Sequence, residues 1–113
     1  MPARIGFGER RRRLLQQELA HIVDQLPQLG INKAILIGAL AEGQVGPNSN
    51  IELIIVQDTK DKFTARADFF YSHLQVEAGM DVFVYTPEEF KGLETSNRPL
   101  WHAIQRGTLF YEA

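Results

Sequence analysis

The sequence lacks cysteine altogether, and it has neither a long apolar run nor a strong excess of charge of one sign. Without cysteine the chain can form no disulfide, zinc knuckle or thiol nucleophile, which fits a cytoplasmic location. Its apolar runs are far shorter than the roughly 20 residues that a membrane-spanning helix needs, so we expect no membrane partner. The formal net charge of -2 creates no general attraction to DNA or RNA, which argues against a nucleic-acid ligand.

What the sequence does contain is the composition of a folded globular protein. Hydrophobic residues make up 44% and charged residues 23% of its 113 residues, which is enough for one modest core. We therefore predict a single domain over residues 1–113. The N-terminal stretch MPARIGFGERRRR is charged and has no apolar segment of a secretory signal after it, so we expect mature sequence. Its cluster Arg10–Arg13 is typical of a solvated helix start, with contact to a nucleotide or an acidic partner as the alternative.

The spacing of apolar residues predicts alternating helices and strands. Steps of four and three predict helices, and short continuous apolar runs predict buried strands. Thr86, Pro87 and Glu89 form a helix start with an N-cap, a proline at the first helical position and a capping-box glutamate. The predicted fold class is α/β (α+β), a small mixed β-sheet with helices packed mainly on one face. The expected elements are helices at 9–29, 62–76, from 86 and at 97–107, a helical turn at 39–44, and strands at 33–38, 51–58, 80–86 and 108–112.

The stretch LIGALAEGQVGPNSNIELII, residues 36–55, has the layout of a phosphate-handling site. An apolar strand ends in Gly38-Ala39, ten residues follow, and the next strand begins Asn50-Ile51-Glu52-Leu53. A further acid, Asp81, opens a later strand. This pattern resembles the minimal nucleotidyltransferases of the DNA polymerase beta superfamily. The segments VYTPEEF and GTLFYEA are also similar to those of small bacterial members, so the resemblance covers nearly the whole chain.

The resemblance implies a nucleotidyltransferase fold and nucleotidyl transfer, often adenylylation, by two-metal chemistry. In such sites carboxylates hold a pair of Mg²⁺ ions, and the glycine turn lets backbone N–H groups approach the phosphates. The resemblance assigns catalysis to Asn50, Glu52 and Asp81, metal binding to Glu52 and Asp81 with Asn50 in place of a carboxylate, and nucleotide or phosphate binding to Gly38, Ala39, Glu42, Gly43 and Ser49.

Three residues of this chain depart from the family pattern. Ala39 replaces the usual serine or glycine and has no side-chain donor. Glu42 stands where many members have an arginine, and its charge has the wrong sign for a polyphosphate. Asn50 replaces an aspartate, so it offers only a neutral carbonyl to a hard cation. We therefore expect a degenerate metal site, with Glu42 as an alternative substitute ligand.

Two functions follow from this pattern. The first is a pseudoenzyme that acts as a binding or regulatory, antitoxin-like module, with a helical HEPN-type protein as its partner. The alternative is an active Mg²⁺-dependent nucleotidyltransferase that transfers a nucleoside monophosphate from a nucleoside triphosphate to a hydroxyl of a protein or small molecule. Magnesium is the implied cofactor only for the active enzyme. Edge strands and aromatic residues permit a homodimer.

A third, unrelated alternative is a structural subunit of another α/β assembly, which separation of Asn50, Glu52 and Asp81 in space would favour. The histidines have no second ligand at helical spacing, so we expect them to be structural or on the surface. The aromatic residues are more typical of a core or an interface than of a base-stacking platform. These residues are His21, His73 and His102, and Phe69, Phe70, Tyr71 and Trp101.

Overall fold

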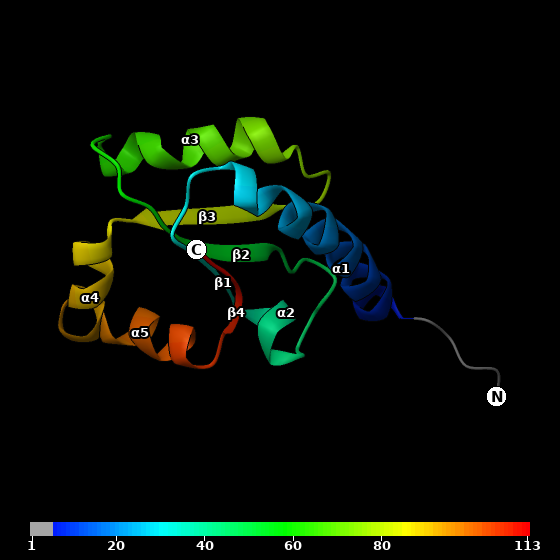
Figure 1. The fold of residues 1–113 in the computed structure, drawn as a ribbon. Helices are drawn as coiled ribbons and strands as arrows, with labels where there is room; N and C mark the ends of the chain where they lie inside the picture. Colours follow the sequence, from blue (N-terminus) through cyan, green and yellow to red (C-terminus); the bar gives the residue numbers. More distant parts are fainter. Residues whose placement is uncertain (1–5) are drawn as a thin grey trace.

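A computed structural model of the protein describes residues 6–113, so residues 1–5 of the N-terminal stretch expected to be mature sequence lie outside the described residues. The order of elements confirms the order predicted from the sequence (Figure 1). No helix within residues 6–113 is long and apolar enough to cross a membrane. The elements are α1 (Phe7–Gln25), the 3-10 helix η1 (Leu26–Gln28), β1 (Lys33–Ile37), α2 (Ala39–Glu42), β2 (Ile51–Val56), α3 (Phe63–Leu74), β3 (Met80–Tyr85), α4 (Pro87–Ser96), α5 (Arg98–Gln105) and β4 (Thr108–Glu112).

The four strands form one mixed sheet in the order β3-β2-β1-β4. Strand β2 runs parallel to β3, whereas β1 is antiparallel to both of its neighbours. The central strands β1 and β2 are almost continuous apolar runs, because side chains on both of their faces are buried. This confirms the prediction that the second strand is central.

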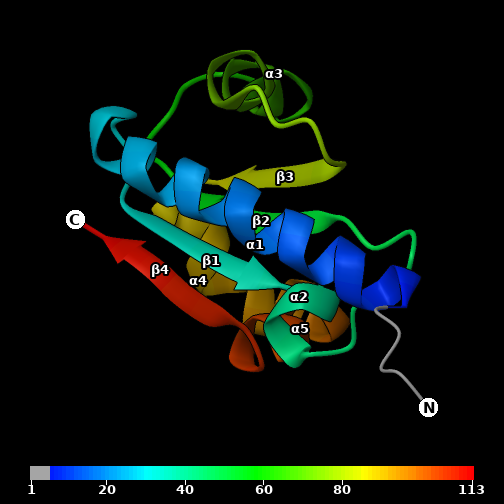
Figure 2. The ribbon, with the colours of Figure 1, turned by 90° about the vertical axis from the view of Figure 1, so that its right-hand side faces the viewer.

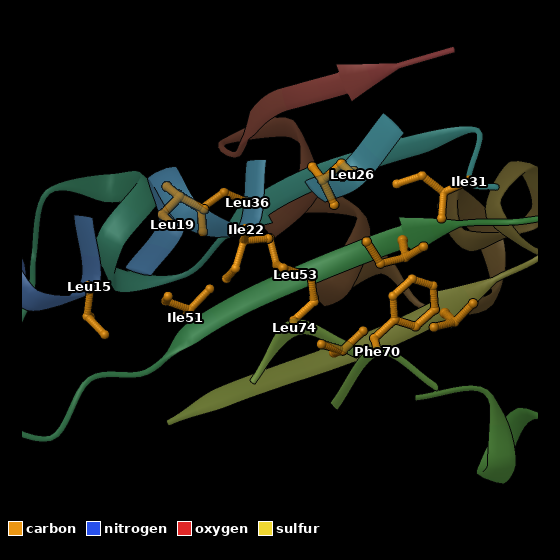
Figure 3. Packing of buried hydrophobic residues seen from close by; sticks show 14 of the residues in the cluster. Leu15, Leu19, Ile22, Leu26, Ile31, Leu36, Ile51, Leu53, Phe70 and Leu74 are labelled. Atoms are coloured by element: carbon orange, nitrogen blue, oxygen red, sulfur yellow. The ribbon is translucent and has the colours of Figure 1, made fainter. Parts of the chain in front are cut away.

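One face of the sheet is covered by α1 and α3. Figure 2 shows α1 lying across this face, with α4 and α5 behind the sheet. The apolar stripe of α1 and the buried side chains Phe70 and Leu74 of α3 pack against Leu36 of β1 and Leu53 of β2 (Figure 3). The stripe consists of Leu15, Leu19, Ile22 and Leu26, at the helical spacing seen in the sequence.

The opposite face is covered by α4 and α5. Ile35 and Ile37 of β1 and Ile54 of β2 pack there with Leu93 of α4 and Ile104 of α5. The expectation that helices pack mainly on one face is therefore wrong. The physical reason is that β1 and β2 carry apolar side chains in both directions, and each set needs its own cover.

The two edges of the sheet are protected in different ways. On β3 the Val82 N–H donates to the Tyr71 hydroxyl at 3.0 Å, and the Val84 carbonyl accepts from the Arg66 guanidinium at 3.2 Å. Both partners come from α3. On β4 the register with β1 is interrupted by an irregularity at the partners of Ala34 and Ile35. Capped groups and bulges reduce the tendency of an edge strand to pair with another chain.

Candidate functional site

The predicted site residues gather at one end of the sheet, where β1 ends and β2 and β3 begin. Glu52 is the register partner of Ile37 on β1 and of Asp81 on β3. Because β2 and β3 are parallel, their first residues emerge at the same end, and the antiparallel β1 delivers Gly38 there. The structure therefore brings Gly38, Glu52 and Asp81 together, contrary to the unrelated-subunit alternative.

Gly38 makes the turn from β1 into α2, and the turn requires glycine for two reasons. Its φ of 79° lies in the left-handed region that side chains disfavour. In addition, a Cβ atom at this position would overlap the carboxylate of Glu52. The glycine of the sequence pattern thus makes room for the first acid of the site.

Asn50, just before β2, is held by a cation from another element. The Nη2 of Arg11 donates to Asn50 Oδ1 at 3.2 Å, and its Nε donates to the Ser49 carbonyl at 2.7 Å. The Asn50 amide also lies so close to Gly79 that a Cβ at Gly79 would overlap it. The side-chain oxygen of Asn50 is therefore engaged by a guanidinium within the chain.

Arg11 is the functional candidate that sequence reasoning missed, because it was grouped with a basic cluster typical of a solvated helix start. Arg12 and Arg13 do fit that interpretation, since both pair with Glu9 and are exposed. Arg11 is different because it lies four residues before Leu15, on the same line as the apolar stripe of α1. That spacing is the signal that could have separated it from its neighbours.

Glu42, which was expected to repel a polyphosphate, is also paired. Its Oε1 lies 3.0 Å from Nε of Arg106, which follows α5. Both side chains are partly exposed, so the pair is a weak one. No local pattern in the sequence connects these residues, which are 64 positions apart.

The remaining predicted phosphate-binding residues take part in the local backbone. Ala39 is the first residue of α2, and Gly43 ends this helix with a left-handed φ of 72°. The Ser49 hydroxyl accepts a hydrogen bond of 2.9 Å from the Gly46 N–H, which closes the loop before β2. Each of them therefore has a structural role in shaping the turn and loop around Gly38.

The electrostatics of the site are dominated by negative charge. Partial burial raises the pKa of Glu52 above its ordinary value of 4.5, and the nearby charges of Asp81 and then Glu42 raise it further. Such a site favours either a proton or a cation close to Glu52.

The donor set does not fit a pair of Mg²⁺ ions. Magnesium favours charged oxygen ligands, and here Glu52 and Asp81 are the acids on adjacent strands. The third acid, Glu42, is paired with Arg106, and the oxygen of Asn50 accepts from Arg11. Within residues 6–113, no three His, Cys, Asp or Glu side chains are grouped so that they could hold a metal ion.

The other candidate side chains lie outside this cluster. Phe70 is buried in the core, whereas Phe69 and Tyr71 are each 41% exposed. Trp101 packs against Phe90 of α4 with ring centroids 6.0 Å apart. The structure thus bears out a core position for Phe70. The three histidines, His21, His73 and His102, are all exposed, as the surface interpretation predicts.

Comparison with known proteins identifies the fold. A candidate nucleotidyltransferase from Sulfolobus solfataricus matches with a TM-score of 0.55 and 15% identity over 94% of this chain and 84% of that one. A toxin–antitoxin structure with AMP-PNP matches with a TM-score of 0.54 and 18% identity over 83% and 73%. The chain has the nucleotidyltransferase fold. No family model and no curated protein matches the sequence.

In this structure the glycine turn lies against an acid, and the effect of this contact on stability can be measured. Gly38→Ala should lower the free energy of unfolding by about 1–3 kcal/mol, because φ 79° with ψ -157° is strained for a side chain, and displacement of the flexible Glu52 carboxylate adds to this strain. Gly43→Ala is the matched control, since its φ is also positive but a Cβ there meets nothing within 4 Å. Gly43→Ala should lower the free energy of unfolding by about 1 kcal/mol. Urea unfolding measures both.

Both substitutions are then measured again in a protein that also carries Glu52→Ala. There the penalty of Gly38→Ala should be smaller, because the overlapping carboxylate is gone, but it should still exceed that of Gly43→Ala, because the backbone strain at φ 79° and ψ -157° remains. Equal penalties for Gly38→Ala with and without Glu52 would show that the contact does not govern the turn.

The raised pKa of Glu52 predicts a pH-dependent stability. The folded state holds this proton more tightly than the unfolded chain, so Glu52 favours folding below about pH 4.5 and loses that contribution as the pH rises through its raised pKa. Glu52→Gln should therefore be more stable than wild type at pH 7, and the difference should vanish towards pH 4. Urea midpoints between pH 4 and 8 measure this. Glu94→Gln, an exposed change on α4, should follow wild type throughout; a destabilised Glu52→Gln at pH 7 contradicts the prediction.

Proposed function

We propose that this protein is a nucleotidyltransferase-fold pseudoenzyme that acts as a binding and regulatory, antitoxin-like module. The observation that carries the proposal is the hydrogen bond from Arg11 to Asn50. At the position where the family pattern has a metal-binding aspartate, this chain has a neutral amide whose oxygen accepts from a guanidinium. A metal ion would have to displace or approach that positive charge, which opposes its binding.

The charges around Gly38 also oppose a bound polyphosphate. Asp81 and Glu42 are both close enough to Glu52 to contribute to its raised pKa. Two like charges about 4 Å apart repel by roughly 4 kcal/mol at an effective dielectric near 20. The nearby cations are already engaged, Arg11 by Ser49 and Asn50 and Arg106 by Glu42.

The proposed partner is a helical HEPN-type protein that this chain restrains by contact. Support comes from the toxin–antitoxin structure with AMP-PNP, which shares the fold. Support also comes from the surface, which exposes several large apolar side chains that a protein partner could cover. They are Phe63, Phe69, Tyr71, Phe83 and Leu109.

One observation favours the alternative of an active enzyme. Glu52 and Asp81 remain register partners on adjacent strands, so a single Mg²⁺ ion could be held by these two carboxylates. In that case nucleotide binding should depend on both acids, and the next experiment separates the two functions.

The contact between Arg11 and Asn50 predicts the effect of restoring an aspartate at position 50. Asn50→Asp should raise the free energy of unfolding by about 0.5–1 kcal/mol, because the hydrogen bond to Arg11 becomes charge-assisted, and MgCl2 with ATP should add no further stabilisation. Arg11→Met with Asn50→Asp frees the new carboxylate and should give stabilisation that depends on Mg²⁺. Thermal unfolding and calorimetry with MgCl2, with ATP and with both measure these effects.

Arg12→Met with Asn50→Asp is the matched control, since Arg12 is exposed and pairs only with Glu9 among the described residues. It should behave like Asn50→Asp alone. Binding of Mg²⁺ and ATP to the wild-type protein at about micromolar concentration, abolished by Glu52→Gln and Asp81→Asn, contradicts the pseudoenzyme and supports the active enzyme.

If this chain restrains a toxin by contact alone, it should protect cells from that toxin without the carboxylates of Glu52 and Asp81. The gene beside this one, if it encodes a small helical toxin, is expressed with and without this chain while growth is followed. Growth should recover equally well with wild type and with the Glu52→Gln, Asp81→Asn double variant, because contact needs no catalysis. Loss of protection in a double variant that is folded and expressed at the wild-type level would instead indicate nucleotidyl transfer to the toxin.

A further inference from the structure

A cavity lies at the end of the sheet opposite to Gly38. It has a volume of about 390 Å³ and is bounded by the start of β1, the end of β2 and the helices α4 and α5. Strand β1 begins at Lys33, which lines the cavity, and ends next to Gly38, so the length of the strand separates the two sites. This volume falls within the usual range of small-molecule pockets.

The walls of the cavity are apolar and aromatic. Phe90 of α4 and Trp101 of α5 both line it, with ring centroids 6.0 Å apart and an angle of 63° between the rings. Val56 at the end of β2 and Pro87 at the start of α4 complete the apolar lining. Tilted aromatic rings with an apolar lining suit a flat ring system.

Two lysines give the cavity a positive charge. The Nζ of Lys33 lies 5.7 Å from the centroid of the Phe90 ring and 3.3 Å from a carboxylate oxygen of Glu112. Lys91 also lines the cavity, and it has no ion pair within 4 Å among residues 6–113. Asn32 also lines the cavity. One lysine is thus partly neutralised, and the other is available to a ligand.

We propose that this cavity binds a small planar aromatic anion, one or two rings with a carboxylate or a phosphate. The rings lie against Phe90 and Trp101, and the anionic group lies near Lys91 and Lys33. An apolar pocket with a few polar groups of one sign at its rim is the usual composition of such a site. The proposal does not depend on the proposed function, because the site shares no lining residue with the Gly38 turn.

Trp101 provides a direct reporter of binding, because it is the single tryptophan of the chain. Its indole N–H gives one resonance in a two-dimensional NMR spectrum of nitrogen-15-labelled protein. Three probes are titrated: 2-naphthoate as an aromatic carboxylate, 2-naphthamide as its neutral counterpart, and AMP as an aromatic phosphate. We expect this resonance to shift saturably below about 1 mM with at least one of the two anions, and at least fivefold more weakly with 2-naphthamide.

Charge-removing variants test the role of the lysines. Lys33→Met and Lys91→Met keep most of the apolar stem and should each weaken anion binding roughly threefold to tenfold. The control is Arg13→Met, which removes an equal charge on α1 over the opposite face of the sheet and should leave the affinity unchanged.

The probes also distinguish the source of the anion. Binding of 2-naphthoate alone supports an aromatic carboxylate, and binding of AMP alone supports a nucleotide. Binding of both supports a site selective for charge rather than for a particular anion. Absence of saturable shifts with all three probes would overturn the proposal, as would equal affinity for 2-naphthoate and 2-naphthamide or affinities unaffected by both lysine changes.

Discussion

The arrangement of this protein depends on the antiparallel pair β1 and β2, which is buried on both faces. Ile35 and Ile54 point to the side of α4 and α5, and Leu36 and Leu53 point to the side of α1 and α3. A one-residue shift in the register of either strand would exchange its two faces, so the apolar pattern on both sides fixes the pairing. That fixed register is what sets Glu52 opposite Ile37, next to the Gly38 turn.

Because β1 and β2 are antiparallel, their pairing places loops of different chemistry at the two ends of the sheet. At one end the acids Glu52 and Asp81 adjoin a tight glycine turn, where negative charge accumulates. At the other end Lys33 and Lys91 border an aromatic cavity between the strands and α4. A charge at one end is separated from the other by about the length of a strand, and solvent screens much of the interaction. The charges at one end therefore have little influence on the other end.

Much of the fold follows from local signals, and the rest from contacts that leave no local trace. The order of the elements and the capping box at Thr86 and Glu89 were predictable, because apolar period and capping chemistry act over a few residues. The cover on both faces was missed because the spacing that defines a strand does not say which helix packs on it. For the site, the convergence of Glu52 and Asp81 was predictable once the strands were placed in order. The pairing of Glu42 with Arg106 was not, because it joins distant parts of the chain.

The most informative of these missed contacts is the one between Arg11 and Asn50, because it changes how the asparagine is interpreted. Taken alone, Asn50 would be interpreted as a weakened metal ligand, as the resemblance implies. With the guanidinium of Arg11 on its oxygen, it belongs to a link between α1 and the start of β2 that also includes the Ser49 carbonyl. Unlike a bound metal ion, the guanidinium of Arg11 is covalently attached to the chain and cannot diffuse away. The neutral amide and the guanidinium are thus chemically matched, which is consistent with the proposed role of the site in binding rather than in catalysis.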